Sequence, residues 1–187
     1  MNWDRIKRVS VPGTNPVTLD EAKARLRIDV DTDDVDLLSM IRGAADFIEG
    51  PNGAGIAITS QQYQVFYDSF PSEFTLPIHP VISVDSIKYE LSGEQTLSTS
   101  VYETDVYRGL IRPKSGQSWP STDTVYNAVT VTYTAGYSEV PQDLKDAVLL
   151  LAGFRYENRE ELAPIALEHI PMGARYIIEQ YRRHRFG

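Results

Sequence analysis

The sequence contains no cysteine among its 187 residues. This absence excludes disulfide bridges, thiolate metal sites and catalytic thiol chemistry. The three histidines, His79, His169 and His184, are far apart in the sequence, and none has a partner at metal-ligand spacing. The sequence therefore predicts no metal site and no cofactor, and a cysteine-free chain fits the reducing cytoplasm.

Long hydrophobic runs are also missing. The N-terminal segment MNWDRIKRVSVPG has no apolar core of signal-peptide length, and no segment approaches the roughly 20 apolar residues of a membrane span. We therefore expect no membrane association. A composition of 42% hydrophobic and 24% charged residues predicts a globular chain with a core of its own.

Basic residues are scarce in most of the chain. The formal net charge is −8, but residues 171–187 hold four arginines and one glutamate, so residues 1–170 carry −11. Phosphate contacts need lysine and arginine, so this acidic body argues against nucleic-acid binding. The basic end, RRHRFG, suits either a contact with nucleic acid or an acidic protein, or a plain solvated charge run.

Helical signals occur near both ends of the chain. Thr18 and Glu21 have the spacing of a capping box, which predicts a short helix over about 18–27. An apolar stripe predicts a second helix over about 33–49, and the near-continuous apolar run VLLLA predicts a buried central helix over 141–158. The predicted core positions of these last two helices share apolar character at helical spacing: Leu37, Ile41, Ile48, Leu144, Val148 and Leu151.

Between the helical segments the period changes to that of strands. Five or six short runs rich in β-branched and aromatic residues predict an antiparallel β-module. Gly136 and Pro141 follow its last strand and are predicted to form the hinge that returns the chain to the helices. The predicted fold class is α+β, mainly α: a helical bundle around a long central helix, with the β-module as an insertion. The expected boundaries are 1–60, 61–135, 136–163 and a C-terminal arm over 164–187, which contains a final amphipathic helix.

Two motifs resemble ligand sites but lack essential parts. The aspartates Asp29, Asp31 and Asp33 have the spacing that opens a calcium loop, yet Asp34 and Met40 stand where that loop requires glycine and glutamate. Helix capping is the better interpretation. The segment GPNGAG has no preceding strand and no following Lys-Ser/Thr, so a loop is predicted there rather than a phosphate site.

No catalytic signature is present. Glu103 and Asp105 alternate along a predicted strand and would share a face, as the two acids of a carboxylate-based hydrolase do. A solvated strand face is the commoner meaning of that pattern. The sequence therefore predicts that the protein is not an enzyme.

The C-terminal arm is rich in aromatic residues and arginine, which are the residue types enriched at protein interfaces. We interpret it as a binding arm that is separate from the folded body, so that deletion of residues 171–187 would leave the body folded. Its candidate contact residues are Arg175, Tyr176, Tyr181, Arg182, Arg183, Arg185 and Phe186.

Four segments, in chain order, are VTLDEAKARLRID, DLLSMIRGAADFIE, VTVTYTAGYSEVPQDLKDAVLLLAGFRYENRE and IPMGARYIIEQYRR. Together they resemble the head–tail connector proteins, also called adaptor or head-completion proteins, of long-tailed phages and gene transfer agents. The most specific element is AGY-x-x-VP-x-DL-x-x-A-x-LLL, followed by YE-x-RE. The β-module is longer than in the smallest connectors.

This resemblance implies a structural protein of the virion, made in the cytoplasm of a bacterial host and placed at the head–tail junction. It implies a homo-oligomeric ring, a dodecamer in the family, that docks beneath the portal protein through its C-terminal arm. The ring would extend the DNA channel, through which DNA passes without specific binding, and would carry the stopper or tail-terminator protein. The alternative is another tail or baseplate component, or a binding module that acts through its β-module.

Overall fold

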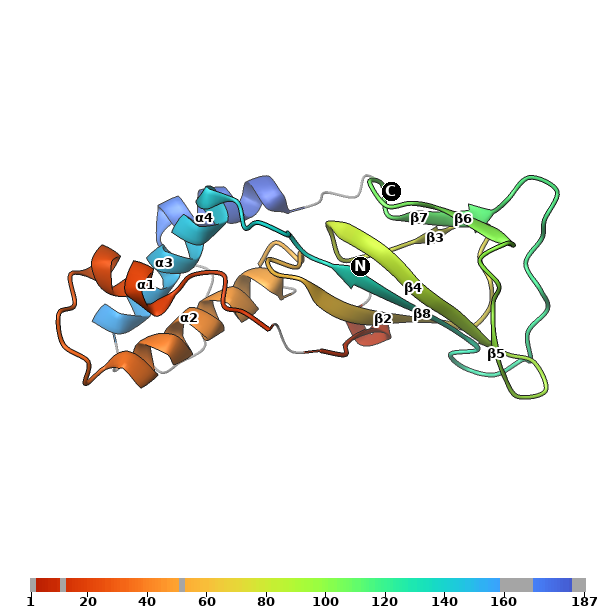
Figure 1. Ribbon diagram of the computed structural model, residues 1–187, viewed down its shortest axis with the longest axis horizontal. Coiled ribbons are helices and arrows are strands. Elements are labelled where there is room, and N and C mark those ends of the chain that lie inside the picture. Colours follow the sequence, from red (N-terminus) through yellow and green to blue (C-terminus); the bar gives the residue numbers. More distant parts are fainter. Residues whose placement is uncertain (1–2, 11–12, 51–52, 159–169, 183–187) are drawn as a thin grey trace. The chain divides into compact units, whose positions relative to one another are not determined.

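The computed structural model describes residues 3–10, 13–50, 53–158 and 170–182, which form four α-helices and eight strands (Figure 1). These elements belong to two units, and the chain passes between the units three times. We call them the β unit, which is Met1–Gly13 with Ser60–Gly136, and the helical unit, which is Thr14–Thr59 with Tyr137–Gly187.

Helix α1, Leu19–Leu26, begins at the predicted capping box. The backbone N–H of Thr18 donates to Glu21 Oε2 at 2.7 Å, and the N–H of Glu21 donates to Thr18 Oγ1 at 3.1 Å. Two free donors of the first turn are thereby satisfied. The same bond from Thr18, helped by Lys145, lowers the pKa of Glu21. The predicted start of this helix is confirmed.

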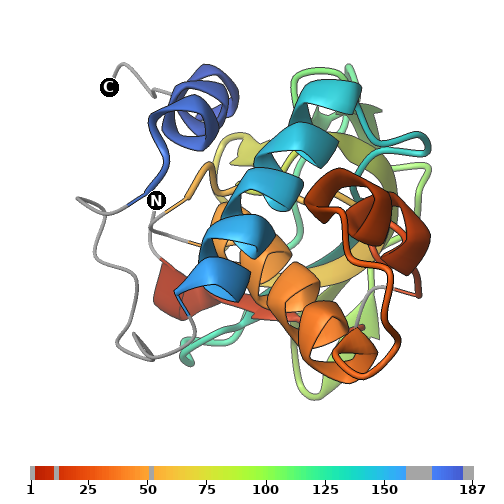
Figure 2. The same ribbon diagram turned by 90° about the vertical axis from the view of Figure 1, so that its left-hand side faces the viewer.

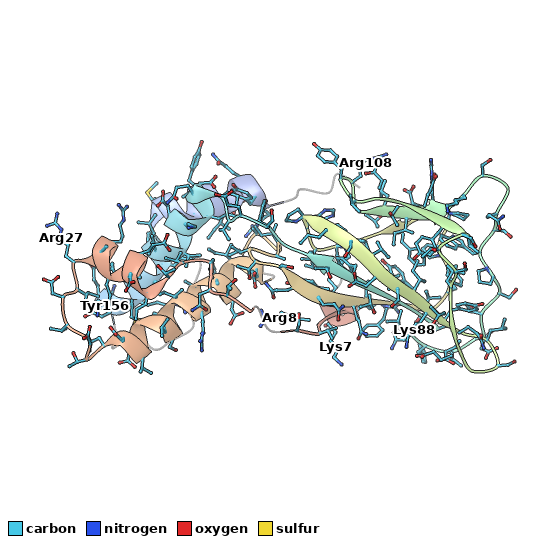
Figure 3. The ribbon with its side chains drawn as sticks, viewed as in Figure 1. Lys7, Arg8, Arg27, Lys88, Arg108 and Tyr156 are labelled. Carbon is cyan, nitrogen blue, oxygen red and sulfur yellow. The ribbon has the colours of Figure 1, made fainter. Side chains whose placement is uncertain are left out.

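Helix α2, Asp34–Glu49, follows a turn rich in aspartate. Asp33 at its N-cap makes no capping bond; its carboxylate accepts a hydrogen bond of 2.7 Å from the hydroxyl of Tyr156 on α3. Figure 3 labels Tyr156. Asp34 pairs with Lys23 of α1 at 2.9 Å, and Asp31 pairs with the same ammonium at 2.5 Å. These aspartates therefore join helices to one another, which is a structural use of the run that resembled a calcium loop.

Helix α3, Gln142–Glu157, packs against α2, with α1 and α4 on either side of it (Figure 2). Helix α4, Met172–Tyr181, completes the helical unit. Because α3 touches all three other helices, its VLLLA run is covered on several sides. The apolar side chains beneath these helices form one cluster, whose members exposed by 1% or less are Val17, Ala22, Leu37, Ile41, Ala44, Ile48, Ile58, Leu144, Ala147, Val148, Leu151, Ala152 and Ala174.

The predicted mainly α fold with a long central helix is wrong. Helices α2 and α3 have 16 residues each, so α3 is no longer than its neighbour. The described strands form two sheets with a core of their own, and helices and sheets are roughly balanced. Helix α3 is apolar on nearly all sides because three other helices pack against it, and not because of a greater length.

The larger sheet of the β unit has the strand order β1-β2-β8-β4-β5, and all its pairings are antiparallel. Strand β8 is central, although it is the last strand in the sequence, and Tyr133 on it lies opposite Tyr63 of β2. The strand bounds are β1 Ile6–Arg8, β2 Gln61–Tyr67, β4 Val81–Glu90, β5 Glu94–Thr96 and β8 Val129–Ala135.

The smaller sheet has the order β3-β7-β6, with β3 at Phe74–Thr75, β6 at Tyr102–Asp105 and β7 at Leu110–Pro113. Aromatic contacts link the two sheets, because Phe74 of β3 lies edge-on to Tyr67 of β2 with ring centroids 4.9 Å apart. Phe70 stacks on Trp119 at 5.1 Å, so this tryptophan belongs to the packing of the β unit. Burial raises the pKa of the Tyr133 hydroxyl, which accepts a hydrogen bond from the backbone N–H of Ile78.

Candidate functional site

Helix α4 has one buried and one exposed face. Ala174 and Ile178 are 0% and 3% exposed and belong to the core of the helical unit. On the opposite side Met172 is 87% and Tyr176 is 69% exposed, and Arg175 is also exposed. Met172 and Tyr176 are four residues apart, so they lie side by side on one face. An exposed thioether, an aromatic ring and a guanidinium together are typical of a protein-binding surface. We call Met172, Arg175 and Tyr176 the α4 face.

The C-terminal end of α4 is fixed to the rest of the helical unit. The hydroxyl of Tyr181 lies 2.8 Å from both carboxylate oxygens of Asp143, at the start of α3, and its ring lies edge-on to Tyr137. Burial, with the nearby Asp143 carboxylate, raises the pKa of Tyr181. Arg182 donates to the backbone oxygen of Gly53 at 3.0 Å and pairs with Glu179.

These contacts divide the predicted contact residues into two groups. Arg175 and Tyr176 are available on the surface, whereas Tyr181 and Arg182 hold α4 in place. The remaining three, Arg183, Arg185 and Phe186, lie outside the described residues. The sequence analysis missed Met172, although its spacing of four from Tyr176 was a readable signal.

The attachment of α4 also changes the expected effect of removing residues 171–187. That deletion would expose the core beneath Ala174 and Ile178 and would break the Tyr181–Asp143 bond, so the body would be destabilised. Point substitutions on the exposed face are the cleaner probe.

Replacing Tyr181 by phenylalanine is expected to lower the unfolding free energy by about 1.5–3 kcal/mol, because the bond to a charged acceptor is lost. The stabilisation in the wild type is complete below the unfolded-state pKa of about 10 and is lost as the pH rises through the raised folded-state pKa. Urea denaturation of the wild type and of Tyr181→Phe at neutral and alkaline pH checks this prediction. The difference between their unfolding free energies should become smaller at alkaline pH. A constant difference would show that the bond is not the cause.

The six predicted core residues lie on α2 and α3, and each is 0% or 1% exposed: Leu37, Ile41, Ile48, Leu144, Val148 and Leu151. Gly136 is the last residue of the β unit and has a φ of 133°, a conformation that other residues rarely adopt. Pro141 is the N-cap of α3.

A shallow hollow on the smaller sheet contains the predicted pair Glu103 and Asp105. Glu103 is paired with Arg112 at 2.6 Å, and Asp105 accepts a hydrogen bond from the backbone N–H of Arg108 in the β6–β7 turn. Figure 3 labels Arg108. The Glu103 carboxylate raises the pKa of Arg112. Both acids are therefore engaged in ion pairing and turn formation, which does not favour acid–base catalysis.

Two tyrosines in loops of the β unit are each 90% exposed, and the sequence analysis singled out neither. Tyr107 lies in the β6–β7 turn, and Tyr126 precedes β8 beside the half-exposed Val125. Within the described residues, no three acidic or histidine side chains are placed to hold a metal ion. No helix in that part of the chain is both long and apolar enough to span a membrane.

Residues 17–184 match the model of the head completion protein family, so the chain belongs to that family. The protein is thus a structural component of a head–tail connector and not an enzyme. No curated protein sequence matches the chain.

Solved structures of gene transfer agent (GTA) particles contain similar chains, and in each case 97% of either chain is covered. One, from the virion of a native GTA particle, is 27% identical with a TM-score of 0.79. A second, from the neck of an empty GTA particle computed with C6 symmetry, is 26% identical with a TM-score of 0.77. A third, from the neck of a native GTA particle computed with C12 symmetry, is 28% identical with a TM-score of 0.72.

Proposed function

We propose that the protein forms a ring of twelve copies at the head–tail junction of a gene transfer agent, prophage or phage particle. The ring docks beneath the portal protein, extends the DNA channel and joins head to tail. Family membership and the symmetric necks that contain similar chains support this proposal. The single structural observation that carries the portal contact is the exposed pair Met172 and Tyr176 on a helix whose opposite face is fixed in the core.

The α4 face is proposed to contact the portal. Its apolar and cationic side chains suit a protein partner, and the bonds of Tyr181 and Arg182 hold the helix rigid, so little conformational entropy is lost on docking. The β unit is proposed to meet the stopper or tail-terminator protein through its exposed loop tyrosines Tyr107 and Tyr126. Tyrosine supplies a large contact area with few rotatable bonds.

DNA is proposed to pass through the ring without specific binding. The net charge of −8 disfavours tight contacts with the phosphates of DNA. Such contacts would slow the passage of DNA through the ring. This differs from a DNA-binding role, in which clustered lysines and arginines would line the channel.

Electron microscopy of particles from a strain that lacks this gene tests the proposed function. We expect filled or emptied capsids and tails that are made separately and remain unjoined, and a plasmid copy of the gene should restore joined particles. Normally joined particles in the deletion strain would contradict the proposal.

A further inference from the structure

Gly43 lies in the interior of α2, where glycine weakens a helix relative to alanine. A Cβ atom built on Gly43 would overlap Nη1 of Arg155 and would lie 3.2 Å from its Cζ. The three nearest heavy atoms all belong to this one guanidinium. The place that a methyl group would fill on α2 is therefore taken by an arginine head group from α3.

Arg155 is half-buried, yet within the described part of the chain its guanidinium has no ion pair or hydrogen bond. Burial lowers the pKa of Arg155, and the carboxylate of Asp46 only partly offsets that effect. The arginines Arg5, Arg112 and Arg182, by contrast, are each paired with a carboxylate. Arg155 is thus a partly desolvated cation that has a carboxylate nearby, on Asp46, but no carboxylate bonded directly to it among the described residues.

A guanidinium held in this way suits one ligand chemistry above others. Its planar fork matches the two oxygens of a carboxylate, and a partly desolvated cation gains most from a directly bonded anion. The nearby Asp46 carboxylate and the net charge of −8 oppose the approach of a polyanion such as DNA. Neither Asp46 nor the net charge prevents a single carboxylate from bonding directly to the guanidinium of Arg155. With 26 acidic and 18 basic side chains, the protein itself has such groups in excess.

We propose that Arg155, seated on Gly43, receives an exposed carboxylate from the neighbouring copy of this chain and so forms part of the subunit contact. This inference rests on the proposed ring. In a ring each contact is head-to-tail, so the two bonded residues occupy different places on the surface of one copy. The proposed carboxylate therefore belongs to the neighbouring subunit, and in an isolated copy the described residues offer Arg155 no direct ion pair.

Two variants separate this role from a role in folding. Arg155→Gln keeps most of the stem but removes the charge, so the melting temperature of the isolated protein should stay the same or rise. Gly43→Ala should raise it, because alanine favours the helix interior and only the flexible end of Arg155 has to move. Both variants should nevertheless assemble poorly. Arg155→Gln lacks the guanidinium, and Gly43→Ala displaces it from its place on α2.

The assay complements the deletion strain with each variant and counts copies of the protein per portal-bearing capsid by quantitative mass spectrometry. We expect at least about a tenfold loss for Arg155→Gln and for Gly43→Ala, since losing one partner of a desolvated charge pair weakens an interface strongly. Arg42→Gln is the matched control: Arg42 is the exposed neighbour of Gly43 on α2, and its variant should keep the wild-type copy number.

Wild-type copy number for both test variants would overturn this inference and leave the proposed function intact. Joined particles in the uncomplemented deletion strain would instead overturn the proposed function. A lower melting temperature for Arg155→Gln, together with wild-type assembly of the stable Gly43→Ala variant, would assign Arg155 to the fold and reject the subunit contact. Rings that assemble fully but fail to retain DNA would point to a phosphate ligand and would also reject it.

Discussion

Replacing Leu151 by alanine is expected to lower the free energy of unfolding of the helical unit by about 2–5 kcal/mol. Leu151 is 1% exposed and lies on α3, in the cluster that α2, α3 and α4 share. The loss combines the transfer free energy of the removed methyl groups with the cost of the cavity that they leave. A loss of this size is a large fraction of the stability of an ordinary domain.

The helical circular dichroism signal during urea denaturation measures this effect, because the four described α-helices all lie in the helical unit. Tryptophan fluorescence follows the β unit separately, because both tryptophans, Trp3 and Trp119, belong to that unit. Val35→Ala is the control: Val35 is on α2 but 80% exposed, so a change within about 0.5 kcal/mol is expected. An unchanged helical transition for Leu151→Ala would remove α3 from the core.

Replacing Met172 and Tyr176 together by serine is expected to abolish docking to the portal. Both side chains are exposed, by 87% and 69%, so the isolated variant should fold and melt like the wild type. If each is a central contact, its truncation costs about 2 kcal/mol or more, which is about 30-fold in affinity. Because both positions lose affinity, the variant should not sediment with portal rings under conditions in which the wild type does.

Co-sedimentation with purified portal rings measures docking, and complementation of the deletion strain measures the joining of heads to tails. Tyr107→Ser is the matched control, because Tyr107 is 90% exposed but lies on the β unit. It should bind the portal normally. Normal docking of the Met172 and Tyr176 variant would place the portal contact elsewhere, and loss of docking in the Tyr107 variant would move it to the β unit.

The helices could be predicted closely because their signals are local. The capping box of Thr18 and Glu21 marks the start of α1, and the apolar stripe of α2 and the proline before α3 mark their ends to within one or two residues. Each of these signals acts within one or two turns, so a single sequence contains it.

The balance of the fold and the division into two sheets could not be predicted in the same way. Strand β1 has only three residues and pairs with β2, more than 50 residues further along the chain. The pairing partner of a strand depends on distant residues, and a short edge strand carries little pattern of its own. The apolar run of α3 was interpreted as a long central helix, whereas three neighbouring helices account for its burial.

The candidate site was predictable in type but not in detail. Aromatic residues and arginine near the C-terminus indicated a contact surface, and the structure shows that Tyr181 is bonded to Asp143 while Tyr176 is exposed. Helical periodicity separates these two tyrosines only when the bounds of α4 are known. The position of the Arg155 guanidinium could not be predicted from the sequence, because it depends on the space beside Gly43, a glycine of another helix.

The central position of β8 and the discontinuity of both units have a consequence for synthesis on the ribosome. The larger sheet cannot close until Val129–Ala135 enters between β2 and β4, and α2 lacks its main neighbour until α3 has been made. Both cores are therefore completed late, by residues 129–181, and the earlier strands and helices wait with apolar faces uncovered. A nascent chain stalled before Val129 should therefore be recognised by chaperones and proteases through these uncovered apolar faces, although all three strands of the smaller sheet have already been made.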